Sequence, residues 1–218
     1  MRSTTVNINP LFPILACVCC LAFAAPAGHS TDFSGGEVGK VPQDMQVVNG
    51  AFAVAQFNGD KVLELPGDPL DTFGVLFGPP DQVELTVAAR AQGESSGRRH
   101  PEFGVGAGDV AGFRLMFLPG QKRVELRKGD DPVASADYGW RWASGSWTEL
   151  RLRVRKTADG SWKVEGKAWR AGDPEPQQWA VSVEEKDQPT AGRASLWAVP
   201  FSGKPIRFDN LSATPAGS

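Results

Sequence analysis

Apolar and polar residues alternate strictly along residues 147–156, which indicates a β-strand with one buried and one solvent-facing side. The two sides carry Leu150, Leu152 and Val154, and Glu149, Arg151, Arg153 and Arg155, respectively. Residues 162–169 alternate in the same way, with Trp162 and Val164 on the inner side. Asp159-Gly160 between them favours a turn, because glycine tolerates positive φ. We therefore predict a β-hairpin with Trp169 on the same wet side as the arginines.

The chain from residue 31 onward reads as more than ten short strands separated by turns. Asn49-Gly50 predicts a hairpin turn within residues 46–55, and Pro79-Pro80 should end the strand that begins near residue 72. No stretch has a helical period, and 25 glycines and 17 prolines fit many turns. The sequence therefore predicts an all-β fold, an antiparallel β-sandwich.

Residues 1–25 have the pattern of a secretory signal peptide. Arg2 precedes a short apolar run, which ends in small residues near Ala24 and Ala27. The run falls short of the about 20 apolar residues that a membrane span needs. We expect a secreted or periplasmic protein, with residues 26–218 as a single domain. A lipoprotein site at Cys17 is less favoured, because the apolar run continues past it.

The cysteines and charges exclude several classes of function. All three cysteines lie in the predicted signal peptide, so disulfides, thiolate nucleophiles and cysteine metal sites are not expected in the mature chain. Without Arg2 the net charge is about −3, which is not the basic excess of a nucleic-acid-binding protein. His29 and His100 make no pair that suggests a zinc site or a catalytic triad.

Five segments in order resemble the second half of a concanavalin A-like lectin/glucanase jelly roll. These are Trp147-x-x-Leu-Arg-Leu-Arg-Val, Val164-x-Gly-Lys-Ala-Trp169, Gly172-Asp-Pro-Glu-Pro-x-x-Trp179, Gly192-x-Ala-Ser-Leu and Phe208-Asp-Asn-Leu. They are similar to laminin-G-like and 3-keto-disaccharide-hydrolase-like domains of secreted bacterial proteins. The resemblance implies two curved antiparallel sheets and a role in carbohydrate binding or cleavage, although fold alone does not establish function.

The carboxylates argue against hydrolysis of the glucanase type. Such enzymes place Glu-x-Asp-x-x-Glu on one strand, and the one Glu-x-Asp here is Glu185-Lys186-Asp187. Thr190 stands where the third carboxylate would be, and Pro189 interrupts the strand. We interpret these acids as a solvated loop.

Seven tryptophans supply candidate sugar platforms, because aromatic rings stack on the apolar faces of sugars. We take Trp140, Trp142, Trp147 and Trp169 as binding candidates. Trp162, Trp179 and Trp197 are predicted to pack in the core, and core packing is also the alternative for the four candidates.

Arg151 and Arg153 lie on the wet side of the first hairpin strand. They are candidates for contacting an anionic glycan. The favoured alternative is a charge ladder across the two strands, with Glu149 and Glu165 as partners.

Asp32 and Asp209 lie on the opening and closing strands, which such folds place side by side. Together they are a candidate for a structural calcium ion, since calcium prefers oxygen ligands. The alternative for Asp209 is a buried capping hydrogen bond. No other cofactor is expected.

The sequence thus favours a non-catalytic, lectin-like protein that binds carbohydrate. A glycoside hydrolase and a laminin-G-like structural or protein-interaction domain remain the alternatives.

Overall fold

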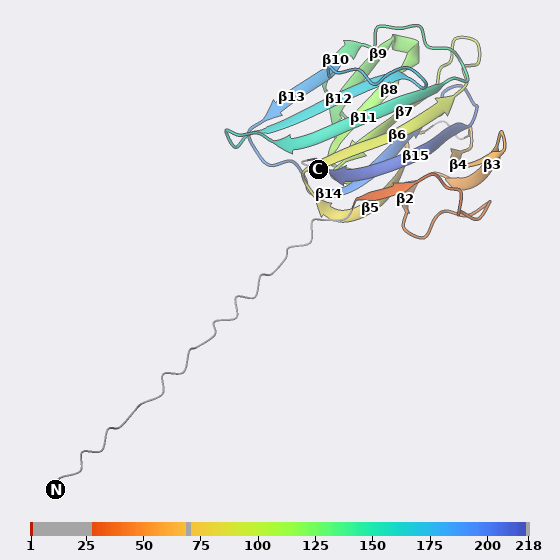
Figure 1. Cartoon of the computed structure of the whole chain (residues 1–218). Coiled ribbons are helices and arrows are strands. Elements are labelled where there is room, and N and C mark those ends of the chain that lie inside the picture. The colour runs from red at the N-terminus through yellow and green to blue at the C-terminus, as the bar shows by residue number, and fades with distance from the viewer. Residues whose placement is uncertain (2–27, 69–70, 217–218) are drawn as a thin grey trace.

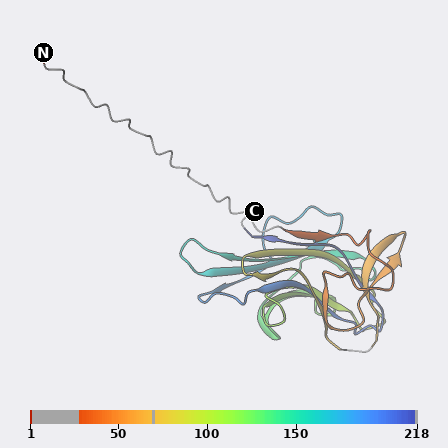
Figure 2. The same cartoon turned by 90° about the horizontal axis from the view of Figure 1, so that it is seen from below.

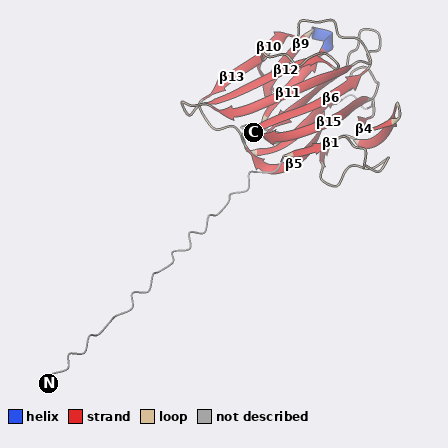
Figure 3. Cartoon of the chain, viewed as in Figure 1, coloured by secondary structure: helices blue, strands red, loops and turns tan. Residues whose placement is uncertain are grey.

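The structure, a computed structural model, describes Met1, residues 28–68 and residues 71–216. Residues 28–68 and 71–216 form two layers of antiparallel β-strands, seen from two directions in Figures 1 and 2. Figure 3 shows that strands dominate the described residues, with one short helical turn, η1 (Pro119–Gln121). No helix among the described residues is long and apolar enough to cross a membrane. The predicted signal peptide, with its cleavage site and Cys17, lies outside the described residues apart from Met1.

The two layers confirm the predicted antiparallel β-sandwich. Sheet A has the order β13-β12-β11-β6-β15-β4-β3, with β1 also paired to β15, and sheet B has the order β10-β9-β8-β7-β14-β5-β2. The strands are β1 (His29–Thr31), β2 (Gln46–Asn49), β3 (Ala53–Phe57), β4 (Asp60–Leu65), β5 (Phe73–Gln82), β6 (Leu85–Gly93), β7 (Glu102–Ala107), β8 (Phe113–Leu118), β9 (Arg123–Lys128), β10 (Asp131–Asp137), β11 (Trp147–Lys156), β12 (Trp162–Arg170), β13 (Val181–Glu185), β14 (Gly192–Val199) and β15 (Ile206–Pro215).

The core lies between the sheets and is built from every second residue of the strands. Phe113, Leu115 and Phe117 of β8 face inward, as do Leu150 and Leu152 of β11, and all five are fully buried. Alternation along each strand then places the intervening residues on the outer face, which is the face of a sheet that points away from the other sheet.

The predicted hairpin of β11 and β12 is confirmed in its register. Val154 pairs with Val164, and Arg153 pairs with Glu165. In the turn the Gly160 amide donates to the Thr157 carbonyl at 3.0 Å, and Gly160 has a φ of 89°. Residues 147–170 therefore fold locally as their alternation indicated.

The hairpin predicted around Asn49-Gly50 was wrong. β2 pairs with β5 in sheet B, whereas β3 pairs with β4 in sheet A, so the chain crosses between the layers here. Gly50 has a φ of 101°, and a Cβ on it would lie 2.8 Å from a ring carbon of Phe73. Gly50 therefore lies where the chain crosses from one sheet to the other. The strands on either side of it pair with β5 and β4 and not with each other.

Pro79-Pro80 also does not end the strand, as had been predicted. β5 continues to Gln82, and its pairing with β14 shifts between Gly192 and Ala194. Gly78 has a φ of 74°, so the prolines lie in a bulged stretch. Proline has no amide hydrogen to donate to a neighbouring strand, and a bulge tolerates it because no such hydrogen bond is required there.

Four of the connections at one end of the sandwich, which we call the loop end, are important for the site. They are residues 94–101 after β6, 119–122 after β8, 138–146 after β10 and 200–205 after β14. Strand pairing brings them together, since Gly93 pairs with Ile206 and Glu102 pairs with Val199. Segments far apart in sequence therefore meet at this end.

Candidate functional site

The loop end contains a cavity of about 880 Å³ lined by aromatic rings. Tyr138, Trp140 and Trp142 come from the connection between β10 and β11, and His100 comes from the connection between β6 and β7. The polar residues Lys122, Asp137 and Arg141 complete the lining, with Pro119, Gly120 and Gly139. The structure thus brings together two of the four tryptophan candidates, Trp140 and Trp142.

The rings of this cavity are anchored to the core. Trp140 stacks on the buried Phe117 with centroids 5.6 Å apart, and Tyr138 packs on the same ring at 4.7 Å. His100 meets Trp142 edge to face at 6.1 Å. Such ring pairs add about 0.5–1.5 kcal/mol each beyond area burial. The cavity wall is therefore held in place by the sandwich even though it is built from loops.

Three ring nitrogens of the cavity residues have no hydrogen-bond partner among the described residues: Nε1 of Trp140, Nε1 of Trp142 and Nδ1 of His100. All three atoms are buried, so a ligand in the cavity would reach them only if the rings moved. Burial, followed by the charge of Asp137, raises the pKa of the Tyr138 phenol, so its hydroxyl stays protonated at neutral pH. Apolar ring faces beside polar groups such as Lys122, Asp137 and Arg141 suit a polyhydroxylated ring.

A second cavity of about 390 Å³ adjoins the first and shares His100 and Gly120 with it. It is also lined by Arg98, Arg99, Glu102, Gln121 and Phe201. Phe201 is 43% exposed, which is unusual for a large apolar side chain in this protein. Burial raises the pKa of the Glu102 carboxyl, although the charge of Arg127 opposes the shift. The two cavities share part of their lining, and we refer to them together as the groove at the loop end.

Trp147 and Trp169 lie elsewhere, on the outer face of sheet A. Trp147 is half-buried between the Arg90 guanidinium, 4.7 Å from its centroid, and Phe57, at 6.4 Å. The predicted side of Trp169 is confirmed, but its predicted exposure was wrong. Trp169 is only 9% exposed, with Arg151 and Lys167 each 5.9 Å from its ring. Long charged side chains cover the ring, as their apolar stems allow.

Arg151 and Arg153 belong to a charge ladder on the same face. Arg153 pairs with Glu165 at 2.7 Å, and Arg151 pairs with Glu175 at 2.8 Å. Glu165 is one of the two predicted partners. Glu149, the other predicted partner, has no ion pair among the described residues, and Arg151 pairs with Glu175 instead. Burial raises the pKa of the Glu149 carboxyl, against the charges of Arg90 and Arg151. These two arginines therefore already have carboxylate partners within the protein.

The tryptophans predicted to be core residues divide three ways. Trp162 is buried in the core, as predicted. Trp179 is not in the core: it is half-exposed between Arg153 and Lys167, each 4.6 Å from its ring. Trp197 is buried but lies on the outer face of sheet B, where it contacts Met116 and Leu118.

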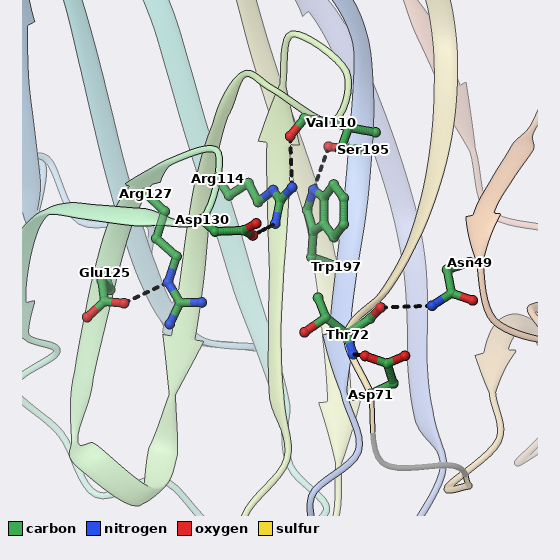
Figure 4. Close-up of polar contacts among 10 residues, drawn as sticks. All are labelled: Asn49, Asp71, Thr72, Val110, Arg114, Glu125, Arg127, Asp130, Ser195 and Trp197. Atoms are coloured by element: carbon green, nitrogen blue, oxygen red, sulfur yellow. Dashed lines mark hydrogen bonds and ion pairs between the residues drawn. The ribbon is translucent and has the colours of Figure 1, made fainter.

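Figure 4 shows the surroundings of Trp197 on that face. The Arg114 guanidinium stacks 3.4 Å from the centre of the indole, donates to Asp130 at 2.8 Å and donates to the Val110 carbonyl at 2.8 Å. The indole Nε1 donates to Ser195 Oγ at 2.9 Å. Beneath the ring, a Cβ on Gly74 would lie 2.7 Å from an indole carbon. With Arg114 on one side and Gly74 on the other, this ring has no face free for a sugar.

Glu125 organises the neighbouring charges of this face. The buried Glu125 carboxylate receives Arg127 at 2.7 Å and Arg123 at 2.6 Å. Charge-assisted pairs of this geometry rigidify a sheet surface. We interpret the outer face of sheet B as a scaffold for the groove at the loop end.

The opening and closing strands are adjacent, since Thr31 of β1 pairs with Leu211 of β15. The Asp209 side chain accepts from Arg90 Nε at 3.1 Å and from the Asn210 amide at 2.8 Å. Asp32 accepts from the amide and hydroxyl of Ser34, and these bonds lower the pKa of its carboxyl. No group of three or more His, Cys, Asp and Glu that could hold a metal ion occurs among the described residues. The calcium site at Asp32 and Asp209 stays a prediction.

Sequence reasoning missed His100, Tyr138, Lys122 and Arg141 as parts of the cavity. His100 was considered only for a zinc site or a catalytic triad, whereas its ring packs on Trp142. The cavity combines three connections, residues 94–101, 119–122 and 138–146, which are separated in sequence by pairs of strands, and no spacing rule links them. The one local signal was Tyr138-Gly-Trp-Arg-Trp, which clusters three aromatic residues in a turn.

Comparison with known proteins identifies the fold and not the function. No protein-family model matches the sequence, and no curated protein matches it either. The structure has the concanavalin A-like jelly-roll fold. It is similar to a carbohydrate-binding module, CBM66, from Bacillus subtilis, with 11% identity, a TM-score of 0.52, and 78% of this chain and 95% of that chain covered.

Two further solved structures have the same fold. The calcium-bound exoplasmic/lumenal domain of VIP36 shares 9% identity and a TM-score of 0.54, with 86% of this chain and 90% of that chain covered. The alginate lyase Aly36B in complex with an alginate trisaccharide shares 9% identity and a TM-score of 0.57, with 88% and 99% covered. The fold prediction is confirmed, and binding proteins and an enzyme both occur among the similar structures.

Proposed function

We propose that this protein binds carbohydrate in the groove at the loop end and does not cleave it. The observation that carries the proposal is the cavity in which Tyr138, Trp140 and Trp142 line one wall beside polar groups. Large ring surfaces with nearby donors match the amphipathic faces of sugars. The carbohydrate-binding module and the exoplasmic/lumenal domain of VIP36 among the similar structures support the proposal by analogy of fold.

The proposal includes export and the extent of the domain. The residue pattern of residues 1–25 supports removal as a signal peptide and a secreted or periplasmic location. Residues 26–218 would then act as one lectin-like domain. A glycan outside the cytoplasm is a ligand that such a protein would meet.

Cleavage is the second candidate function, because Glu102 lies in the groove with a raised pKa. A two-carboxylate mechanism would need a partner, and the other carboxylate lining the groove is Asp137. Asp137 lies on β10 and Glu102 on β7, three strand spacings apart in sheet B. At about 4.8 Å per spacing, their backbones are about 14 Å apart, so the two side chains would have to lean toward each other to bring their carboxyls within the roughly 6.5–9.5 Å of inverting enzymes. We therefore propose binding first and keep hydrolysis as the alternative that the Glu102→Gln variant tests.

A glycan array followed by titration of the Trp142→Ala variant tests the proposal. Loss of a central aromatic contact costs about 2 kcal/mol, so we expect affinity to fall roughly thirtyfold. Trp142→Phe should retain part of the affinity, because it keeps an aromatic face. Trp179→Ala is the matched control, since Trp179 is half-exposed on the outer face of sheet A.

Two results would contradict the proposal. One is full affinity in folded Trp142→Ala together with lost affinity in Trp179→Ala, which would move the site to sheet A. The other is release of reducing ends from a bound glycan that disappears in Glu102→Gln, which would make the protein a hydrolase. Thermal melts of each variant check that the domain is folded.

A further inference from the structure

Most basic side chains of this protein are already engaged by other residues. Among the described residues, seven arginine and lysine side chains have no hydrogen bond, ion pair or aromatic contact: Arg98, Arg99, Lys122, Arg141, Lys186, Arg193 and Lys204. The first four line the groove at the loop end. Free cations are thus concentrated where the aromatic rings are.

These four side chains come from three separate connections. Arg98 and Arg99 follow the Gly97 turn after β6, Lys122 follows η1 in a left-handed conformation with a φ of 55°, and Arg141 lies between Trp140 and Trp142. All four are exposed. The fold thus brings side chains of the same charge from three separate connections to one groove.

The carboxylates of the groove do not balance these cations. Asp137 accepts a hydrogen bond from the Gly139 amide, and Glu102 has a raised pKa. The whole chain has a net charge of −2, so the excess of four cations over two acids is local to the loop end. A local field of this kind attracts an anionic ligand.

We propose that the groove selects an acidic polysaccharide, in which carboxylate or sulfate groups alternate with stackable sugar faces. The proposal rests on carbohydrate binding in the same groove. Trp140 and Trp142 supply the ring contacts, and Arg98, Arg99, Lys122 and Arg141 receive the anionic substituents. Arginine presents a fork of donors that fits carboxylate and sulfate oxygens, and lysine adds a point charge. A neutral glycan would leave these cations without a partner.

Matched pairs of polymers test the charge requirement separately from the sugar requirement. Polygalacturonate is compared with its methyl ester, and carrageenan is compared with agarose, by affinity electrophoresis of the mature chain. We expect at least one acidic polymer to bind about tenfold more tightly than its neutral partner, and the advantage to shrink as salt is raised. The pair that shows the difference identifies carboxylate or sulfate as the group recognised.

Matched variants assign the effect to the groove. Lys122→Gln/Arg141→Gln removes two positive charges from the groove, and Lys186→Gln/Arg193→Gln removes two from the opposite end. We expect the first variant to lose about tenfold in affinity for the acidic polymer and the second to lose less than about twofold. None of these side chains has a partner within the described structure, so both variants should melt like the parent.

The outcomes separate the two proposals. Equal binding of acidic and neutral polymers that is still lost in Trp142→Ala overturns the charge proposal and leaves carbohydrate binding intact. Equal losses in the two charge variants overturn it as well, since they indicate attraction by overall charge. Binding of polyglutamate or a single-stranded oligonucleotide as tightly as the acidic polysaccharide overturns selection of sugars.

Discussion

Two tryptophans on opposite sides of β12 give a quantitative test of the strand register. Trp162 faces the core and is 6% exposed, whereas Trp169 lies on the outer face of sheet A and is 9% exposed. Their accessible areas are thus nearly equal, and area alone predicts nearly equal losses on truncation to alanine. Burying roughly 150–250 Å² at about 25 cal/mol per Å² gives about 4–6 kcal/mol as an upper bound for either ring.

The surroundings of the two rings separate the expected losses. Truncation of Trp162 leaves a cavity in the core cluster that contains Val154 and Val164, with Lys156 5.9 Å from the ring at its edge, so Trp162→Ala should lose about 3–5 kcal/mol. Truncation of Trp169 leaves a site beside Arg151 and Lys167, whose side chains can move and which water can enter. Without the cavity term, Trp169→Ala should lose about 1–3 kcal/mol.

Urea unfolding of the mature chain, followed by far-UV circular dichroism, measures both losses. A difference of about 2 kcal/mol also corresponds to roughly 4–8 °C in melting temperature for a domain of this size. Trp162→Phe is the control and should recover most of the loss. Equal losses, or a larger loss in Trp169→Ala, would refute the assignment of Trp162 to the core side.

Two further predictions concern the sheet surfaces. Burial raises the pKa of Glu165, but hydrogen bonds and charges from Arg153 and Lys163 outweigh it, so the net pKa lies below 4.5. Glu165 therefore stabilises the fold above about pH 4.5 and loses this contribution as the pH falls through the lowered value. The urea midpoint of the parent should drop more steeply below that pH than that of Glu165→Gln; superimposable pH profiles would argue against the ladder. On sheet B, Gly106→Ala places a Cβ 2.4 Å from Ser195 Oγ and disrupts its hydrogen bond to Trp197, which should cost about 1–3 kcal/mol. The control Gly35→Ala has open space and should change stability by less than about 0.5 kcal/mol; a matching small change in Gly106→Ala would contradict the packing described.

Local alternation was enough to predict the hairpin of β11 and β12. Each strand has one apolar side, and a slip by one residue would have exposed Leu150 and Leu152. The same reasoning failed at Asn49-Gly50, because turn chemistry is local and the choice of sheet is not. Whether β3 pairs with β2 or β4 depends on residues throughout both sheets.

Exposure of the tryptophans was harder to predict than their side of the sheet. Alternation placed Trp169 on the outer face, but it could not show that Arg151 and Lys167 would cover the ring. Trp179 follows a stretch rich in proline, and its half-exposed position depends on contacts with β11 and β12. The alternation of apolar and polar residues along one strand does not show which side chains of the neighbouring strands will cover a ring.

The groove itself was only half predicted. Trp140 and Trp142 were candidates because they cluster in a glycine-containing turn, whereas His100 and Lys122 joined them through strand pairing that is distant in sequence. The free cations of the groove became visible once the ion pairs of the other basic residues were known. Charge counting along the chain could not separate paired from unpaired arginines.

The central claim is that a glycan binds at Trp140 and Trp142, and the indole signals of the protein test it most directly. All seven tryptophans lie in the mature chain, so each contributes one indole N–H resonance to a ¹H–¹⁵N spectrum. On titration with an oligosaccharide identified by the glycan array, the resonances of Trp140 and Trp142 should shift the most, while those of Trp147, Trp169 and Trp179 should stay in place. Shifts confined to Trp147, Trp169 or Trp179 would contradict the account and place the binding site on the outer face of sheet A.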